Sequence, residues 1–302
     1  MTDTTFAVGI QSIVVTPFKD DGQVDLSSLQ SLVDGVIQAG VHGITALGVA
    51  AESHKLSTNE RSEIAKHIFD VADNRCDVIV GVSTDELTEV VANAQWAEQF
   101  GAAGVMIAPP HGREYGPALI EHYMQVASIV DLPIVLQDYK AFTGVDLSPG
   151  EMAELVEAVP AIRAIKLETP PTALRIAETR RLIPETIVIV GGIGGVYFLD
   201  ELRNGSAGTM TGFAYPEVLL EIYERFLIGD QVGAEAAYHK YLPLLEFEGQ
   251  PNIGLAIRKE ILRQRGLIVC GKVRDQPPLS NEILSRLADV LHDTGVRELF
   301  DQ

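Results

Sequence analysis

Short apolar runs rich in β-branched residues alternate with longer segments of helical periodicity from residue 11 to about residue 228. Runs such as VIVGV and TIVIV are apolar at nearly every position, which is typical of strands buried on both faces. Because a helical segment follows each run, the pattern predicts parallel strands. The eight runs are 11–15, 44–48, 78–82, 104–108, 134–138, 162–168, 186–190 and 208–212.

Eight βα units within roughly 220 residues predict a (β/α)8 TIM barrel over residues 1–228, with the active site at the carboxyl ends of its strands. An open, doubly wound parallel sheet is the alternative. Three helical stretches follow, at 217–245, 252–264 and 281–292, and the segments between them contain Gly and Pro. We expect residues 229–302 to form a helical appendage packed on the barrel.

Several predicted helices have start or stop signals of their own. Ser57 with Glu60, and Ser148 with Glu151, have the spacing of a capping box, and Pro149 suits a first helical position. Glycines are expected to end three other helices, at positions 40, 101 and 205.

The composition excludes several classes of partner. The formal net charge is -19 and the pI about 4.7, so nucleic acid and anionic lipid are unexpected partners. The first residues, MTDTTFAVGIQ, lack the basic and apolar regions of a signal peptide, and no run reaches the ~18 apolar residues of a membrane span. These features predict a cytoplasmic protein. Cys76 and Cys270 lie in separate contexts and are expected to be buried free thiols.

The sixth run contains the most distinctive chemistry. In Ile162-Arg163-Ala164-Ile165-Lys166-Leu167-Glu168, a period of two puts Lys166 and Glu168 on the face opposite to Ile165 and Leu167. The apolar face suits the covering helices, so Lys166 and Glu168 should point into the barrel mouth. Loss of hydration there disfavours the ammonium form and frees the amine to attack a carbonyl. The alternative is a Lys166–Glu168 ion pair that only supports the barrel.

The chain resembles the dihydrodipicolinate synthase and N-acetylneuraminate lyase superfamily from residue 10 to the C-terminal helices. The segments that carry the resemblance are Val15-Thr16-Pro17-Phe18, Gly48-x-x-x-Glu52-Ser53, Asp131-Leu132-Pro133-Ile134, Thr143-Gly144 and Ile165-Lys166. The resemblance implies that Lys166 forms an imine with a small 2-keto acid, with no other cofactor. It also implies a barrel and a homotetramer built as a dimer of dimers.

Departures from the family pattern reduce the number of reactions that we expect of this chain. The family loop with two hydroxyl residues before glycine and glutamate is Val49-Ala50-Ala51-Glu52 here, so the hydroxyl relay is lost, while the N–H groups of Val49 and Ala50 remain available to a carboxylate. Glu52 is expected to hold its own loop in place.

The family's two proton-transferring tyrosines align with Gln137 and His111, and an arginine that binds the second substrate of the synthase aligns with Phe142. Glutamine exchanges no proton at neutral pH. Tyr139 is either a replacement acid/base or a core or interface residue, and His111 is either a proton shuttle or a solvated loop residue.

Glycines cluster after the seventh run, at 191–195, but not in the arrangement of a dinucleotide-binding loop. Gly191 and Gly192, with Thr209 and Thr211 of the eighth run, are candidates for binding the keto-acid carboxylate; the alternative is a tight turn. The seven histidines show no metal-ligand spacing. A metal-independent reaction is expected.

Glu168 lies two residues from Lys166, roughly 6 to 7 Å along the same strand face, and is the first candidate for the base that takes a proton from C3 of the imine. That assignment favours dehydration of a 2-keto-3-deoxy sugar acid. A pyruvate-dependent aldolase is the second alternative. It ranks below dehydration because cleavage needs a base at the C4 hydroxyl, and the tyrosine that performs this task in the family is missing here. A catalytically silent sugar-acid-binding homologue is the third alternative.

Overall fold

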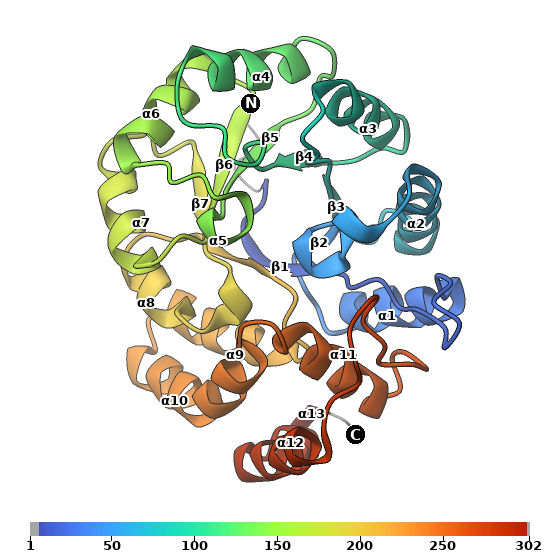
Figure 1. Cartoon of the computed structure of the whole chain (residues 1–302). Helices are drawn as coiled ribbons and strands as arrows, with labels where there is room; N and C mark the ends of the chain where they lie inside the picture. The colour runs from blue at the N-terminus through green and yellow to red at the C-terminus, as the bar shows by residue number, and fades with distance from the viewer. Residues whose placement is uncertain (1–5, 301–302) are drawn as a thin grey trace.

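The computed structural model describes residues 6–300. Eight parallel strands surround a central axis and helices cover them from outside (Figure 1). The strands are β1 (Gly9–Ile13), β2 (Gly43–Ala46), β3 (Asp77–Gly81), β4 (Gly104–Ile107), β5 (Ile134–Asp138), β6 (Ile162–Leu167), β7 (Val188–Val190) and β8 (Gly208–Thr211).

From β1 to β7 each strand pairs with the next in chain order, and β1 also pairs with β8. The gap between β7 and β8 is bridged at Gly191 and Thr209, where the N–H of Gly191 donates to Gly208 O at 3.2 Å and the N–H of Met210 donates to Gly191 O at 3.0 Å. The predicted (β/α)8 barrel with a C-terminal helical extension is therefore confirmed.

The α-helices of the ring and its loops are α1 (Leu26–Gln38), α2 (Thr58–Ala72), α3 (Leu87–Gln99), α4 (Pro117–Ala127), α5 (Lys140–Thr143), α6 (Pro149–Ala158), α7 (Thr172–Arg180), α8 (Phe198–Arg203) and α9 (Pro216–Leu227). Short 3-10 turns follow β2 (η1, Val49–Ala51, and η2, Ser53–Lys55) and β7 (η3, Ile193–Gly195). Both predicted capping boxes are confirmed, at the starts of α2 and α6. Glycine with positive φ follows the ends of α1, α3 and α8, as expected.

Sequence periodicity located every strand but shifted its ends by up to two residues. Six of the predicted runs extend past the observed strand at its carboxyl end: those of β1, β2, β3, β4, β6 and β8. Except at Glu168, which follows β6, the chain has no charged residue there, yet it no longer pairs as a strand. The first C-terminal stretch was predicted as one helix, which is wrong: the chain breaks at Gly229, with φ of 81°, into α9 and α10 (Gln231–Glu248).

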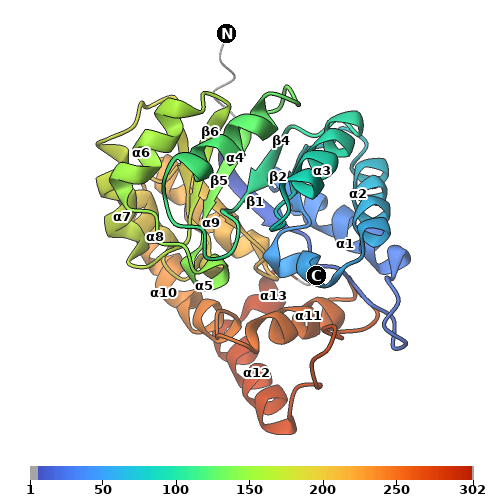
Figure 2. The same cartoon turned by 45° about the horizontal axis from the view of Figure 1, so that its top comes forward.

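The remaining C-terminal helices are α11 (Gly254–Gln264), α12 (Asn281–Thr294) and α13 (Val296–Phe300). Helix α10 packs on α9 and α12. Turning the molecule shows α10 to α13 gathered on one side of the barrel, near the end from which α5 and the β2 loop project (Figure 2).

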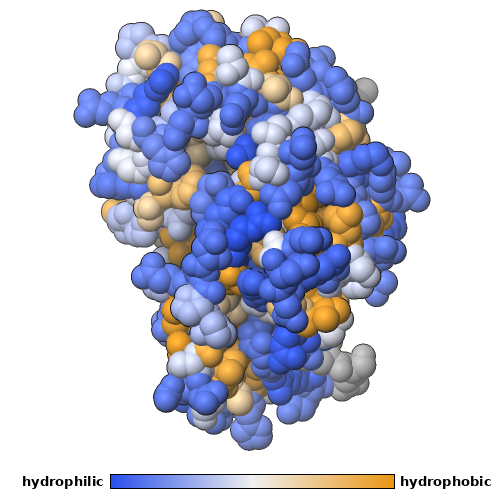
Figure 3. Space-filling model, turned by 45° about the vertical axis from the view of Figure 1, so that its right-hand side comes forward, coloured by the Kyte–Doolittle hydropathy of each residue, from blue (hydrophilic) through white to orange (hydrophobic). Residues whose placement is uncertain are grey.

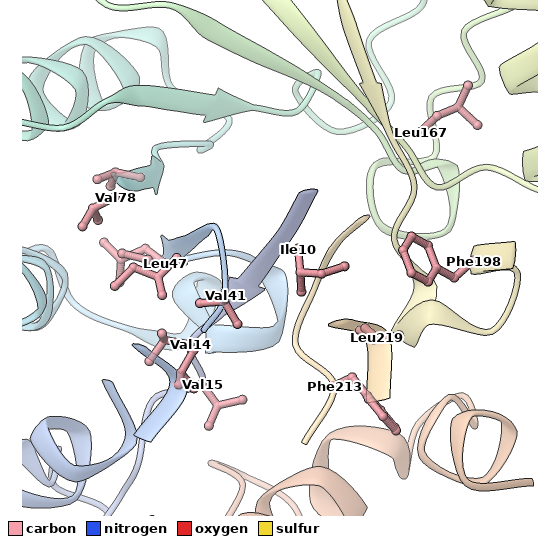
Figure 4. Packing of buried hydrophobic residues seen from close by; sticks show 14 of the residues in the cluster. Ile10, Val14, Val15, Val41, Leu47, Val78, Leu167, Phe198, Phe213 and Leu219 are labelled. Atoms are coloured by element: carbon pink, nitrogen blue, oxygen red, sulfur yellow. The ribbon is translucent and has the colours of Figure 1, made fainter. Parts of the chain in front are cut away.

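Two separate apolar clusters form the core. The larger lies between the strands and their helices, and includes Ile10, Val78, Leu167, Phe198 and Leu219 (Figure 4). The smaller fills the barrel interior, with one residue from every strand except β2, together with Ala7 just before β1: Ala7, Ile13, Ile79, Met106, Val135, Ala164, Val190 and Met210. Membership in these clusters shows which face of each strand points inward.

The exterior is consistent with the acidic composition. The face seen in Figure 3 is largely hydrophilic, interrupted by groups of hydrophobic residues. Within residues 6–300, no helix is both long and apolar enough to cross a bilayer. Cys76 and Cys270 are free, but they are half-buried rather than buried as expected. Cys76 packs at the edge of the larger apolar cluster, and the thiol of Cys270 donates to Asp20 Oδ1 at 3.3 Å.

Candidate active site

Strands β5 and β6 bring the predicted reactive groups together. They pair so that Gln137 lies beside Lys166 and Val135 beside Ala164. Because Val135 and Ala164 belong to the interior cluster, Gln137 and Lys166, each two residues further along, face the same interior at the carboxyl end of the barrel. The inward orientation predicted for Lys166 and Glu168 is confirmed. Only 2% of the surface of Lys166 is exposed.

The amine of Lys166 makes a close ion pair with its neighbour on the strand. Its Nζ lies 2.8 Å from Oε2 of Glu168, and the amide Nε2 of Gln137 donates to the same oxygen at 2.7 Å. The other oxygen, Oε1, packs against the backbone of Gly192, where a Cβ would lie 2.5 Å away. Glu168 is thus positioned within proton-transfer distance of the Lys166 amine, with Gln137 fixing its orientation.

A cavity of about 190 Å³ opens beside this group. Its inner wall includes Gln137, Met106 and the backbone of Gly48 and Val49. Lys166 lies beside Gln137 in the strand register, and among the described residues it is Gln137, not Lys166 or Glu168, that lines the cavity. Gln137, which donates to Glu168, is therefore the residue that connects the cavity with the Lys166–Glu168 pair.

Aromatic rings form the outer wall. Phe142 contacts the rings of His54, His111 and Tyr139, with centroids 5.8, 5.0 and 6.3 Å away. Tyr139 is half-buried, and burial first, then the charge of Glu168, raises its pKa above the ordinary value. Phe142 stands where the synthase pattern has arginine, so this wall offers no cation from that position.

His111 is not merely a solvated loop residue. Its ring Nδ1 lies 2.7 Å from Oδ1 of Asp85, and its backbone N–H donates to the same oxygen at 2.9 Å. About half of its side-chain surface is exposed, at the cavity entrance. Its predicted role as a proton shuttle stays a prediction.

Residues of the C-terminal extension hold the loop after β2 in place. Val49 begins the η1 turn, in which the N–H of Ala51 donates to Gly48 O at 2.9 Å, and Ala50 packs against the interior cluster. Glu52 adopts a left-handed conformation, with φ of 58°, and its carboxylate receives Lys259 Nζ at 2.5 Å and the N–H of Arg274 at 2.9 Å. Glu52 thus ties its loop to α11, a partner that local sequence spacing does not reveal.

The glycine cluster and strand β8 differ from expectation. A Cβ on Gly191 would lie 1.8 Å from Oε2 of Glu201, and Gly192 accommodates Glu168. These two glycines make room for the protein's own carboxyl groups, whereas we had expected them to make room for a substrate. Thr209 and Thr211 alternate with the interior residue Met210, so they point toward the helices, and Thr211 Oγ1 accepts the N–H of Gly194 at 2.9 Å. The structure does not bring these threonines to the cavity.

Two buried groups near the strand ends were missed from the sequence. Arg258 of α11 is bound through Nε to Glu248 at 2.6 Å, and its NH1 would lie 2.8 Å from a Cβ at Gly212. Glu201 of α8 is fully buried behind Gly191. Both come from helices far from Lys166 in the sequence, and no local pattern marks them.

Comparison with known proteins identifies the family of this chain. Residues 7–293 match the model of the dihydrodipicolinate synthetase family. The chain belongs to this family. It is 31% identical to the L-2-keto-3-deoxyarabonate dehydratase of Azospirillum brasilense over 89% of this chain and 88% of that protein.

Two further proteins are similar to this chain over nearly its whole length. The protein YagE of Escherichia coli K12, whose proposed activity is that of a 2-dehydro-3-deoxy-D-gluconate aldolase, is 31% identical over 94% of this chain and 92% of its own length. The crystal structure of dihydrodipicolinate synthase from Rhodopseudomonas palustris superposes with a TM-score of 0.91 at 29% identity, covering 97% of this chain and 99% of that one. Members of this family include dehydratases, aldolases and synthases, so the chain is a lyase-family barrel.

The part of the chain that the structure describes contains no group of three or more His, Cys, Asp or Glu residues placed to hold a metal. Metal independence stays a prediction, which a chelator experiment tests directly. A homotetramer likewise stays a prediction of the family resemblance.

Proposed function

We propose that this protein dehydrates a 2-keto-3-deoxy sugar acid through an imine on Lys166, with Glu168 as the base. The observation that carries the proposal is the 2.8 Å contact between Lys166 Nζ and Glu168 Oε2 beside the cavity. A nucleophile with a proton acceptor at this distance is the arrangement that imine formation requires. The similarity to an L-2-keto-3-deoxyarabonate dehydratase supports the same reaction class.

The pair accounts for imine formation without another acid or base. Glu168 accepts a proton from the Lys166 ammonium group, and the free amine attacks C2 of the keto acid. The C2 oxygen takes up two protons, the one that Glu168 holds and one that the attacking nitrogen loses, and leaves as water. The product is a protonated imine on Lys166 with Glu168 ionised beside it.

The same carboxylate then acts as base and acid in the elimination. Glu168 takes a proton from C3, and the electron pair moves toward the imine nitrogen to form an enamine. The enamine expels the C4 hydroxyl, which takes the proton from Glu168 and leaves as water. Hydrolysis of the conjugated imine consumes one water, releases the dehydrated 2-keto acid and restores the Lys166 amine.

Replacement of tyrosine by Gln137 favours elimination over aldol cleavage. Gln137 uses its amide to hold Glu168 at 2.7 Å, and an amide does not take a proton from a C4 hydroxyl at neutral pH. Glu168, by contrast, adjoins the amine that would hold C2 and so is close to C3. The backbone N–H groups of Val49 and Ala50 are our candidates for the substrate carboxylate.

The test is a panel of 2-keto-3-deoxy sugar acids of different length and stereochemistry, with product identification by mass spectrometry. A dehydratase gives a product one water lighter and no pyruvate. Pyruvate and an aldehyde as main products would move the assignment to aldolase. Binding of these acids without imine trapping by borohydride would instead indicate a silent homologue and would contradict the proposal.

A further inference from the structure

Glu201 is a buried carboxyl group that the proposed reaction does not use. It lies in α8 with 0% of its surface exposed. Within residues 6–300, neither of its oxygens has a hydrogen-bond partner. The nearby Thr172 hydroxyl also lacks one and approaches without the geometry of a full hydrogen bond. An ionised carboxylate in such a place is costly, and a buried group of this kind takes up a proton instead.

Two consecutive glycines relate Glu201 to Glu168. A Cβ on Gly191 would lie 1.8 Å from Glu201 Oε2, and one on Gly192 would lie 2.5 Å from Glu168 Oε1. Because neighbouring residues of an extended chain face opposite sides, Glu168 stands inside the barrel and Glu201 stands behind the same stretch of backbone. Any larger residue at either position would push the carboxyl groups away.

The charges around Glu201 do not stabilise its ionised form. Glu168 of β6 and Asp200 of α8 are negative, Thr172 of α7 is neutral, and Tyr238 of α10, which Glu201 influences in turn, has a pKa raised to about 12. Burial, more than these carboxylates, raises the pKa of Glu201 to about 8. The Thr172 hydroxyl opposes the shift only in part.

We propose that Glu201 is a positioning residue that stays uncharged at neutral pH and so lets Glu168 act as the only ionised member of a carboxyl pair. This inference rests on the proposed role of Glu168. Pairs of carboxyl groups whose surroundings separate their titrations are a general means of keeping one acid neutral and the other ionised.

The neutral state of Glu201 matters because Glu168 must both accept and release a proton in one turnover. A second negative charge in the poorly screened interior makes Glu168 hold the C3 proton more tightly. Its transfer to the departing C4 hydroxyl then slows. Ionisation of Glu201 should therefore lower kcat.

The first test compares the pH profile of kcat in wild type and Glu201→Gln, since glutamine resembles the neutral acid. In wild type, kcat should fall about fivefold between pH 7 and 9, and in Glu201→Gln it should change by less than about twofold. Asp200→Asn is the matched control, because it removes an exposed negative charge one residue away and should keep the wild-type decline. A merely structural Glu201 would leave the pH profile of Glu201→Gln unchanged from wild type, which would overturn the inference.

A second measurement needs no substrate. Glu201 has a higher pKa when folded, about 8, than its ordinary value of 4.5. Its contribution to stability is fully present below pH 4.5 and is lost as the pH rises through 8. The thermal midpoint of wild type should therefore fall relative to that of Glu201→Gln between pH 5 and 8, and the difference should level off above 8.

If Glu201→Gln does not fold, carbon-13 NMR of glutamate side chains in wild type decides the point. One carboxyl group should titrate near pH 8; full ionisation of every glutamate by pH 6 would overturn the inference. Titration near pH 8 without turnover of any keto acid would instead contradict the proposed function, so the two failures are distinguishable.

Discussion

Two buried Lys–Glu pairs in this barrel show what separates a reactive pair from a structural one. Lys166 lies 2.8 Å from Glu168, and Lys259 lies 2.5 Å from Glu52; all four side chains are less than a tenth exposed. Residue type, burial and distance are nearly the same. These three properties therefore do not distinguish chemistry from support.

The difference lies in how fully each pair is satisfied. Lys259 also donates to Lys272 O at 2.9 Å and stands 4.5 Å above the ring of Phe18, and Glu52 receives two further donors. Lys166, in contrast, has Glu168 as its ion-pair partner, and Glu168 is held by Gln137, which lines a cavity. A lysine with unused bonding capacity beside an open space is free to react, whereas a lysine with every proton engaged holds two segments together.

The largest expected effect separates the two lysines by borohydride trapping. With pyruvate or a 2-keto-3-deoxy acid, wild type should gain the mass of the reduced ligand on the peptide that contains Lys166, and Lys166→Ala should gain none. Lys259→Met should still be labelled on Lys166. Label on Lys259, or on the exposed Lys140 in the Lys166→Ala variant, would break the comparison.

The two glutamates should separate by kinetics. Glu168→Gln is nearly isosteric, so it should keep imine trapping while turnover falls by about 10²–10⁴-fold, the range that general base catalysis supplies. Glu52→Gln is the matched control and should retain turnover of the folded protein within about tenfold, since Glu52 is expected to hold its loop and not to touch the substrate. Equal losses in both variants would show that Glu168 only supports the barrel.

The Lys259–Glu52 pair should contribute to the stability of the folded protein. Removing one partner of a buried ion pair costs about 3–5 kcal/mol, because a charge is left without compensation. Lys259→Met should therefore lower the free energy of unfolding by about 3 kcal/mol in denaturant titrations, as Glu52 keeps Lys55 and the N–H of Arg274. A loss below about 1 kcal/mol would mean that the pair does not anchor the β2 loop.

Local pattern predicts only one of these pairs. Lys166 and Glu168 are two residues apart, and strand periodicity alone puts them on one face, which is why the barrel and its central pair were foreseen. Lys259 and Glu52 are 207 residues apart. Their contact arises from the path of α11 across the strand ends, a property of tertiary packing that periodicity does not encode.

The glycines after β7 show the same limit. Their number predicted a close approach of some group to the backbone, but the sequence did not tell which group. Glu201, ten residues downstream on a six-residue helix, occupies that space. The orientation of Thr209 and Thr211 followed a different error: the period of two was available, but the inward residue of β8 is identified only by Met210 in the interior cluster.

The smallest expected effects concern the two residues that compete with Glu168 for the role of base. Tyr139 stacks on Phe142, and burial raises its pKa, so it is protonated at neutral pH and is a poor acceptor for a C3 proton. His111 is held at the cavity entrance by Asp85, about half-exposed. Tyr139→Phe and His111→Asn should each lower kcat/KM by less than about tenfold, through altered packing of the outer wall and not through loss of proton transfer.

Deuterium exchange at C3 of the bound keto acid separates altered packing from loss of proton transfer, because it reports proton abstraction directly. Exchange should continue in both variants and stop in Glu168→Gln; loss of exchange in Tyr139→Phe or His111→Asn, with exchange retained in Glu168→Gln, would transfer the role of base to that residue and leave the Lys166–Glu168 pair as support for the barrel.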